Sequence, residues 1–241
     1  MTWDAVAYSK FRPRYPEELF DFLAAAAPRR TLAWDGATGT GQAAIGLARR
    51  FERVVATDAS AEQVAQALPN PRVVYGVARA EATPLASGSA DLITVAQALH
   101  WLDHDRFFAE VRRVLTPGGV VAAWCYRLIT IAPEIDQVIA ELYHGTLGPY
   151  WPPERRHVDD GYRSVAFPFI ELEAPQLTIE ASMALADLAG YLGTWSAARR
   201  YVAERASDPV AEILPALRDR WGGPAVRRVV RWPVAMRVGR L

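Results

Sequence analysis

The clearest chemical pattern in the sequence is a glycine-rich loop with an acid before it and a second acid one strand later. The loop runs from Asp35 to Gly41, and Asp58 closes the next apolar stretch. Glycines let the backbone approach a ligand closely, and the N–H groups of a following helix point into the same space. Asp35 suits an ammonium group better than a phosphate, and Asp58 can accept both hydroxyls of a ribose. The pattern therefore predicts a nucleoside cofactor that carries a positive charge.

The same loop allows a second interpretation. The stretch 39–44 fits the dinucleotide fingerprint G-x-G-x-x-A, which is typical of enzymes that bind NAD or FAD. In that case Asp35 would lie beside a pyrophosphate, which is a costly placement for an anion. An NAD-binding oxidoreductase thus stays open as the less favoured alternative.

The elements that must position the loop alternate regularly. Short apolar runs predict strands, and runs with apolar residues three and four apart predict helices between them. This alternation is typical of a parallel sheet with helices on its faces. The predicted strands are 31–34, 54–57, 72–77, 90–96 and 120–126, and the predicted helices are 42–50, 60–68 and 103–115.

The second half of the chain differs in composition, because prolines punctuate a segment rich in aromatic residues. Strands are expected at 177–183 and 226–238, and their antiparallel pairing would close a seven-stranded sheet. Helices are expected near 184–192, 197–206 and 209–220. We interpret residues 1–241 as one domain, with an N-terminal lid segment at 1–20, a cofactor-binding half at 31–126 and a substrate cap at roughly 140–225.

Bulk composition excludes several classes of protein. Lys plus Arg and Asp plus Glu both number 27, so no global charge favours nucleic acid or an acidic membrane. No leader segment or membrane span is evident, the single Cys125 lies in an apolar run, and the histidines lack the spacing of metal ligands. We therefore expect a cytoplasmic monomer or homodimer that acts on a small molecule, with no metal, nucleic acid or membrane partner.

Further motifs accompany the loop along nearly the whole chain. They are the stretches 8–16, 80–85, 97–101, 117–119, 194–197 and 231–233. Together with the loop at 35–42, these motifs resemble the class I methyltransferases, in particular the group that contains trans-aconitate methyltransferase. The resemblance implies a Rossmann-like α/β fold with a mostly parallel seven-stranded sheet, an antiparallel last strand and a helical cap. It also implies S-adenosylmethionine as the cofactor.

The resemblance and the loop chemistry together define a predicted cofactor site. Its residues are Tyr8, Asp35, Gly36, Ala37, Gly39, Gly41, Asp58, Ala59, Ala80, Glu81 and Gln97. Two positions depart from the family pattern. Ala37 replaces the first loop glycine, so its backbone must either avoid a positive φ or accept strain of about 1 kcal/mol. Arg79 stands where relatives often carry an acid that contacts the adenine.

Methyl transfer from a sulfonium is an in-line displacement, so holding the acceptor in place is the main task of the enzyme. We expect Arg12 and Arg14 to orient a carboxylate, and Tyr8 to contact the sulfonium. His100 could act as a general base toward a hydroxyl, or it could only orient the substrate. Each of these residues could instead serve packing alone.

The remaining predicted substrate-binding residues are aromatic and would form the walls of a pocket: Trp101, Trp124, Tyr150 and Trp195. The function that we predict is methylation of a small molecule, at a carboxylate or hydroxyl oxygen. A different reaction on the same cofactor, such as an intramolecular cyclisation that releases methylthioadenosine, stays open because Ala37 and Arg79 alter the loops that position it.

Overall fold

The computed structural model describes residues 13–223 and 225–241, which form two compact units. The first, called here the sheet unit, comprises Arg14–Arg127, Arg156–Leu177 and Val234–Leu241. The second, the helical unit, comprises Pro13, Leu128–Arg155 and the described residues of Thr178–Pro233.

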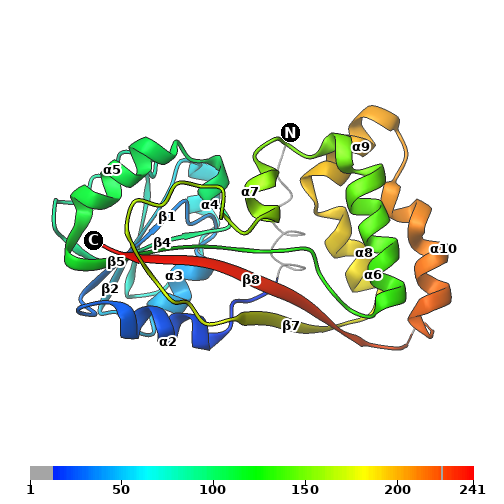
Figure 1. Cartoon of the computed structure of the whole chain (residues 1–241), viewed down its shortest axis with the longest axis horizontal. Helices are drawn as coiled ribbons and strands as arrows, with labels where there is room; N and C mark the ends of the chain where they lie inside the picture. The colour runs from blue at the N-terminus through cyan, green and yellow to red at the C-terminus, as the bar shows by residue number, and fades with distance from the viewer. Residues whose placement is uncertain (1–12, 224) are drawn as a thin grey trace. The chain divides into compact units, whose positions relative to one another are not determined.

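The sheet has the strand order β3-β2-β1-β4-β5-β8-β6, and β7 also pairs with β8. Strands β1 to β5 pair in parallel, whereas β8 runs antiparallel to β5 and β6 (Figure 1). The predicted mostly parallel sheet with an antiparallel last strand is confirmed. The three-residue strand β6 was not predicted. The strands are β1 (Leu32–Gly36), β2 (Arg53–Asp58), β3 (Val73–Val77), β4 (Ala90–Ala96), β5 (Leu115–Tyr126), β6 (Ile170–Leu172), β7 (Leu177–Met183) and β8 (Arg228–Arg240).

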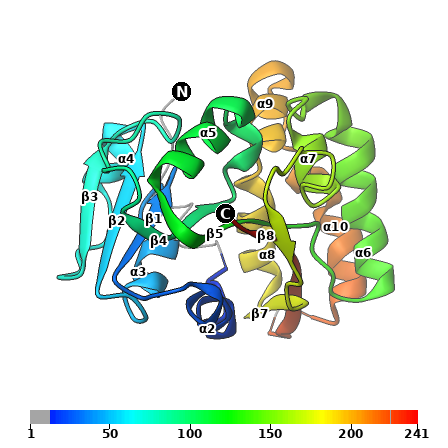
Figure 2. The same cartoon turned by 60° about the vertical axis from the view of Figure 1, so that its left-hand side comes forward.

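Helices cover both faces of the parallel strands. Figure 2 shows α2 (Glu17–Ala26) and α3 (Gln42–Leu47) on one side and α5 (His104–Val114) on the other. The side chains along β5 alternate accordingly: Val120 and Ala122 join the cluster under α2 and α3, and Val121 and Ala123 join the cluster under α5. Both faces are apolar, which is why the strands read as short continuous hydrophobic runs.

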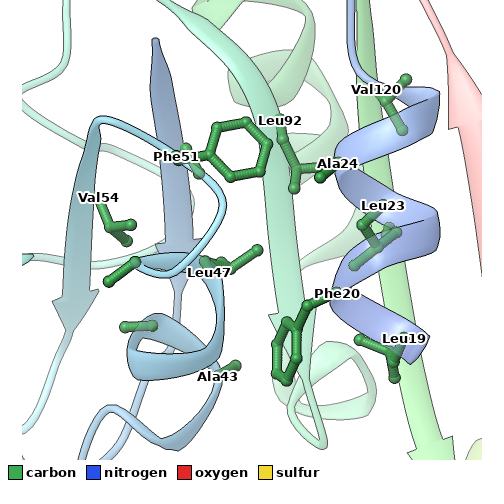
Figure 3. Close-up of a cluster of buried hydrophobic side chains, with 14 of the residues drawn as sticks. Leu19, Phe20, Leu23, Ala24, Ala43, Leu47, Phe51, Val54, Leu92 and Val120 are labelled. Carbon is green, nitrogen blue, oxygen red and sulfur yellow. The ribbon is translucent and has the colours of Figure 1, made fainter. Parts of the chain in front are cut away.

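Helix α2 was not predicted, because residues 17–20 were assigned to a lid segment. Pro16 precedes its first turn, and Leu19, Phe20 and Leu23 bury its apolar side in the sheet unit. Figure 3 shows Phe20 and Leu23 directed from α2 toward the side chains of α3 and its following turn. A Cβ atom on Gly46 would lie 2.2 Å from the Cζ of Phe20, so the packing of α2 on α3 requires glycine there.

The amino-terminal ends of β1 and β4 are fastened by a buried acid. The Asp91 carboxylate accepts the backbone N–H groups of Thr31 and Leu32, and Arg29 donates to it at 3.2 Å. The pairing of β4 with β5 is irregular just beyond this point, because Ala90 pairs with Leu115 but Leu92 pairs with Val120. Strand β5 thus begins five positions before the predicted residue 120 (120 − 115 = 5), with the turn at 116–119 inside it.

The helical unit carries the predicted helices of the second half. They are α8 (Leu185–Gly193), α9 (Ser196–Arg205) and α10 (Pro209–Trp221). Helix α6 (Pro133–Ala140) and a π-helical continuation, η2 (Glu141–Thr146), were not predicted, nor was the short η3 (Gly148–Tyr150). The described residues also form the short helices α4 (Ala61–Ala65) and α7 (Arg155–Asp159). Among the described helices, none combines the length and hydropathy that crossing a membrane requires.

Candidate functional site

The strand order places the predicted loop at the topological switch point of the sheet, between β1 and β4. Strands β1 and β4 are neighbours, with Asp35 paired to Thr94, but β1 leads to β2 on one side and β4 leads to β5 on the other. In open α/β sheets such a switch point opens a crevice beyond the carboxyl ends of the strands, and ligands bind there. The loop that follows β1 and the segment that follows β4, including His100, leave the sheet at this edge.

Asp35 is the penultimate residue of β1 and is fully buried. Its carboxylate accepts the hydroxyl groups of Thr38 at 2.5 Å and Thr94 at 2.7 Å, and the N–H of Ala44 as well. Burial outweighs these hydrogen bonds and raises the pKa of Asp35 to about 6, and the nearby Asp58 charge adds to the rise. Asp35 thus holds the loop through hydrogen bonds to its buried carboxylate. An ammonium group would stabilise the negative charge of that carboxylate. Thr94 is a polar residue among the apolar residues at the centre of the predicted strand 90–96, a signal that the sequence analysis did not use.

The loop backbone adopts left-handed conformations at three positions. Gly39 has φ +58 and Gly41 has φ +85, and a Cβ on Gly41 would lie 2.3 Å from the Tyr75 hydroxyl. Ala37 has φ +52, so of the two outcomes that its replacement of glycine allowed, the backbone accepts the strain. The loop keeps the conformation that a glycine would allow, and the alanine does not signal a rearranged loop.

The carboxylate of Asp58 accepts a hydrogen bond from the loop and can accept further ones from a ligand. One of its oxygen atoms accepts the Gly39 N–H and the other accepts the Ser60 N–H, both at 2.8 Å. Each carboxylate oxygen has two lone pairs, so one on each remains for a ligand. The nearest heavy atom to a Cβ built on Gly39 is the Gln63 Oε1 at 3.8 Å, and Ala59 is exposed. This arrangement suits a vicinal diol next to an open surface.

The loop after β3 is tied to the protein by Glu81. Its Oε1 accepts the N–H of Asp103 at 3.2 Å, and its Oε2 lies 3.4 Å from the Nε of Arg79. Ala80 between them is buried. Arg79, which departs from the family pattern, thus forms an ion pair with Glu81 within its own loop. The cofactor roles of Ala80 and Glu81 stay predictions.

Polar groups gather after β4. Gln97 has φ +59 and donates its N–H to the Trp124 carbonyl, and its buried side-chain Nε2 is without a hydrogen-bond partner among the described residues. His100 follows in the short helix η1 (Leu99–Trp101) and is nearly buried, with its Nδ1 3.1 Å from the hydroxyl of Tyr162. Trp101 is more than half exposed and packs against the His100 ring. The structure brings His100 and Trp101 into contact and adds Tyr162, which no sequence signal indicated; Gln97 lies in the same segment after β4.

The other predicted residues belong to other elements or lie outside the described part of the chain. Trp124 is fully buried on β5 against Tyr15, with a ring-centroid distance of 5.5 Å. Tyr150 and Trp195 are buried in the helical unit, where Arg205 donates to the Tyr150 hydroxyl. Arg14 is exposed. Their roles in substrate binding stay predictions, as do those of Tyr8 and Arg12, which lie outside the described residues.

Comparison with known proteins identifies the family. A family model described as a methyltransferase domain matches residues 34–123. A Dictyostelium discoideum protein named "Putative methyltransferase" is 36% identical over 211 residues, which span 86% of this chain and 80% of the relative. The chain belongs to the S-adenosylmethionine-dependent methyltransferases. The methyltransferase assignment decides between the two interpretations of the glycine-rich loop and excludes the oxidoreductase.

Two further similarities bear on this methyltransferase. A solved structure titled as a "Putative Type II Methyltransferase" from Anaeromyxobacter dehalogenans is 53% identical, with a TM-score of 0.91, and the match covers 95% of this chain and 98% of that one. An "Uncharacterized methyltransferase" of Mycobacterium tuberculosis is 44% identical over 116 residues, about half of each protein. Neither name specifies a methyl acceptor.

The described residues fit S-adenosylmethionine. The spare lone pairs of Asp58 suit the ribose hydroxyls, the open space at Gly39 admits the nucleoside, and the buried charge of Asp35 suits the ammonium of the methionine part. A cofactor of this kind supplies an electrophilic methyl group on a sulfonium. The task of the methyltransferase itself is to hold the acceptor in line with that methyl group.

Proposed function

We propose that the protein methylates an oxygen atom of a small-molecule acceptor, a carboxylate or a hydroxyl, and that it belongs to the group resembling trans-aconitate methyltransferase. The observation that carries this proposal is the pair of polar side chains after β4. Gln97 offers a buried amide N–H without a partner among the described residues, and His100 stands three positions further along the chain. Hydrogen-bond donors beside a methyl donor suit an acceptor oxygen.

The two acceptor classes make different demands on these residues. A carboxylate is already ionised at neutral pH, and it needs only donors or positive charge to hold it. Arg14 is an exposed cation at the start of the sheet unit, and it supports this class together with the predicted Arg12. A hydroxyl acceptor must lose a proton, and His100 is the candidate base for that step.

We expect the helical unit to select the acceptor. Its aromatic residues pack on one another, with the ring of Trp195 5.4 Å from Tyr143 and 5.7 Å from Trp151. We assign acceptor selection to this part of the chain, in line with the cap expected at roughly 140–225. Substitutions such as Trp195→Leu should therefore raise KM for the acceptor and leave the affinity for S-adenosylhomocysteine unchanged.

The proposal is tested by turnover of a panel of small carboxylic acids and the matching alcohols with methyl-labelled S-adenosylmethionine. We expect acceptor-dependent release of S-adenosylhomocysteine and a labelled ester or ether, with loss of turnover in His100→Gln. An ester is distinguished by mild alkali, which releases its label as methanol. Label on nitrogen or carbon, or release of methylthioadenosine, contradicts methylation at oxygen.

A further inference from the structure

The imidazole of His100 is held by a residue far away in the sequence. The Nδ1 of His100 lies 3.1 Å from the Tyr162 hydroxyl, and the two rings stack with centroids 6.1 Å apart and planes at 28°. Both side chains are buried, Tyr162 fully so. The contact therefore fixes the ring plane and engages one ring nitrogen specifically.

Tyr162 is kept in place against conformational strain. It has φ +64, and Gly161 before it has φ +68, so two consecutive residues are left-handed. A non-glycine residue in this region costs about 1–2 kcal/mol. The Tyr162 N–H donates to the His157 carbonyl at 2.6 Å, and its own carbonyl accepts Arg237 at 3.0 Å. Strain of this kind persists only where the surroundings enforce it, and it gathers at functional positions.

The glycine before Tyr162 is part of the same arrangement. A Cβ on Gly161 would lie 2.7 Å from the Cβ of Ala235 and 2.9 Å from the Nη2 of Arg127. The segment after α7 thus packs closely against β8, and the Tyr162 side chain belongs to the buried cluster that includes Leu99 and Phe107. Its hydroxyl has little freedom to leave His100.

The direction of the hydrogen bond follows from acidity. A phenol hydroxyl is a stronger acid than a neutral imidazole N–H, and an imidazole nitrogen is a stronger base than a phenol oxygen. The favoured arrangement has the Tyr162 O–H donating to Nδ1. In a neutral ring the imidazole proton must then be on Nε2.

We propose that Tyr162 is a positioning residue that holds His100 as the Nε2–H tautomer, so that His100 donates a hydrogen bond to an anionic oxygen of the acceptor and does not act as a base. This inference rests on the proposed function, because it places His100 at the acceptor, and it narrows the acceptor to a carboxylic acid. A carboxylate oxygen supplies its own electron pair to the new C–O bond while the C–S electrons leave with the sulfur. No proton has to be removed, so a histidine locked as a donor suffices.

Nitrogen NMR of the imidazole rings tests the tautomer without cofactor or acceptor. In protein labelled with ¹⁵N-histidine, at a pH where the rings are neutral, the His100 signals are those absent from His100→Gln. We expect Nδ1 in the unprotonated range and Nε2 in the protonated range. In Tyr162→Phe the Nδ1 signal should shift, whereas Tyr191→Phe, which removes the hydroxyl of a buried tyrosine in the helical unit, should leave it in place. A protonated Nδ1 in the wild-type protein overturns the inference.

Kinetics separates positioning from a merely structural role. Tyr162→Phe should lower kcat about tenfold, the value of one hydrogen bond, with the affinity for S-adenosylhomocysteine unchanged. Loss of cofactor affinity in parallel with kcat would contradict the inference. Because the NMR result needs no turnover, a failure of the inference and a failure of the proposed function are distinguishable.

Discussion

Replacing Asp35 with asparagine should stabilise the protein without its cofactor. The pKa of this acid rises from 3.8 to about 6 in the folded protein, chiefly because the ionised carboxylate is buried. A shift of about 2 units corresponds to about 3 kcal/mol. Asparagine cannot ionise, but it gives up part of the hydrogen bonding with Thr38 and Thr94, worth about 1 kcal/mol. The expected net gain at pH 7 is about 2 kcal/mol.

The raised pKa of Asp35 also determines how the stability of the folded protein changes with pH. The folded protein retains the Asp35 proton up to about pH 6, whereas the unfolded chain loses it near pH 4. The folded state therefore binds more protons in this interval, and stability falls as the pH rises through it. Above pH 6 the full cost of the ionised carboxylate is present. The asparagine variant should lack this fall.

Urea denaturation from pH 4 to pH 8 measures the effect as the difference between wild type and Asp35→Asn. The control is Asp91→Asn, which removes an equally buried acid at the opposite ends of the strands and should keep the fall between pH 4 and pH 6. The variant should also bind S-adenosylhomocysteine more weakly, because it loses the buried charge that we expect to stabilise the ammonium. If Asp35→Asn is less stable than wild type at pH 7 and keeps the same pH slope, the reasoning is refuted.

Two further substitutions test the packing behind the site by urea denaturation. Ala37→Gly should stabilise the protein by about 0.5 kcal/mol, because relief of the strain at φ +52 exceeds the added entropy of the unfolded chain; destabilisation by more than 1 kcal/mol would contradict this. Gly46→Ala should destabilise by about 1–3 kcal/mol, because its Cβ would overlap the Phe20 ring. Gly193→Ala, in a helix with open space around it, should instead be neutral or stabilising by up to about 1 kcal/mol, and equal effects at the two glycines would be inconsistent with the packing.

The sheet and the cofactor loop could be predicted because both leave local signals. A strand buried on two faces reads as a short apolar run, and the loop carries its acids and glycines within a few positions. At Ala37 the sequence allowed two outcomes, a backbone without positive φ or a strained left-handed one, and the structure shows the second. These features depend on residues that are close along the chain.

What could not be predicted depends on contacts between distant segments. Tyr162 meets His100 across 62 positions, and the pair Gly161 and Tyr162 carries no pattern that distinguishes it from an ordinary turn. Helix α2 carries local signals, with acidic residues in its first turn and apolar residues at helical spacing, and was missed because residues 17–20 were assigned to a lid segment. Strand β6 is three residues long and is defined by its pairing with β8. Tertiary pairing, and not local preference, fixes the Tyr162 contact and strand β6.

The central claim is that the acid at the end of β2 and the loop after β1 bind the cofactor. Isothermal titration of the purified protein with S-adenosylhomocysteine tests it most directly, in wild type and in Asp58→Ala. The account predicts binding of one ligand per chain in wild type and a loss of affinity of about tenfold or more in the variant, because the ribose hydroxyls lose charge-assisted hydrogen bonds. Equal affinity in both proteins, or no binding to a folded wild type, would contradict it.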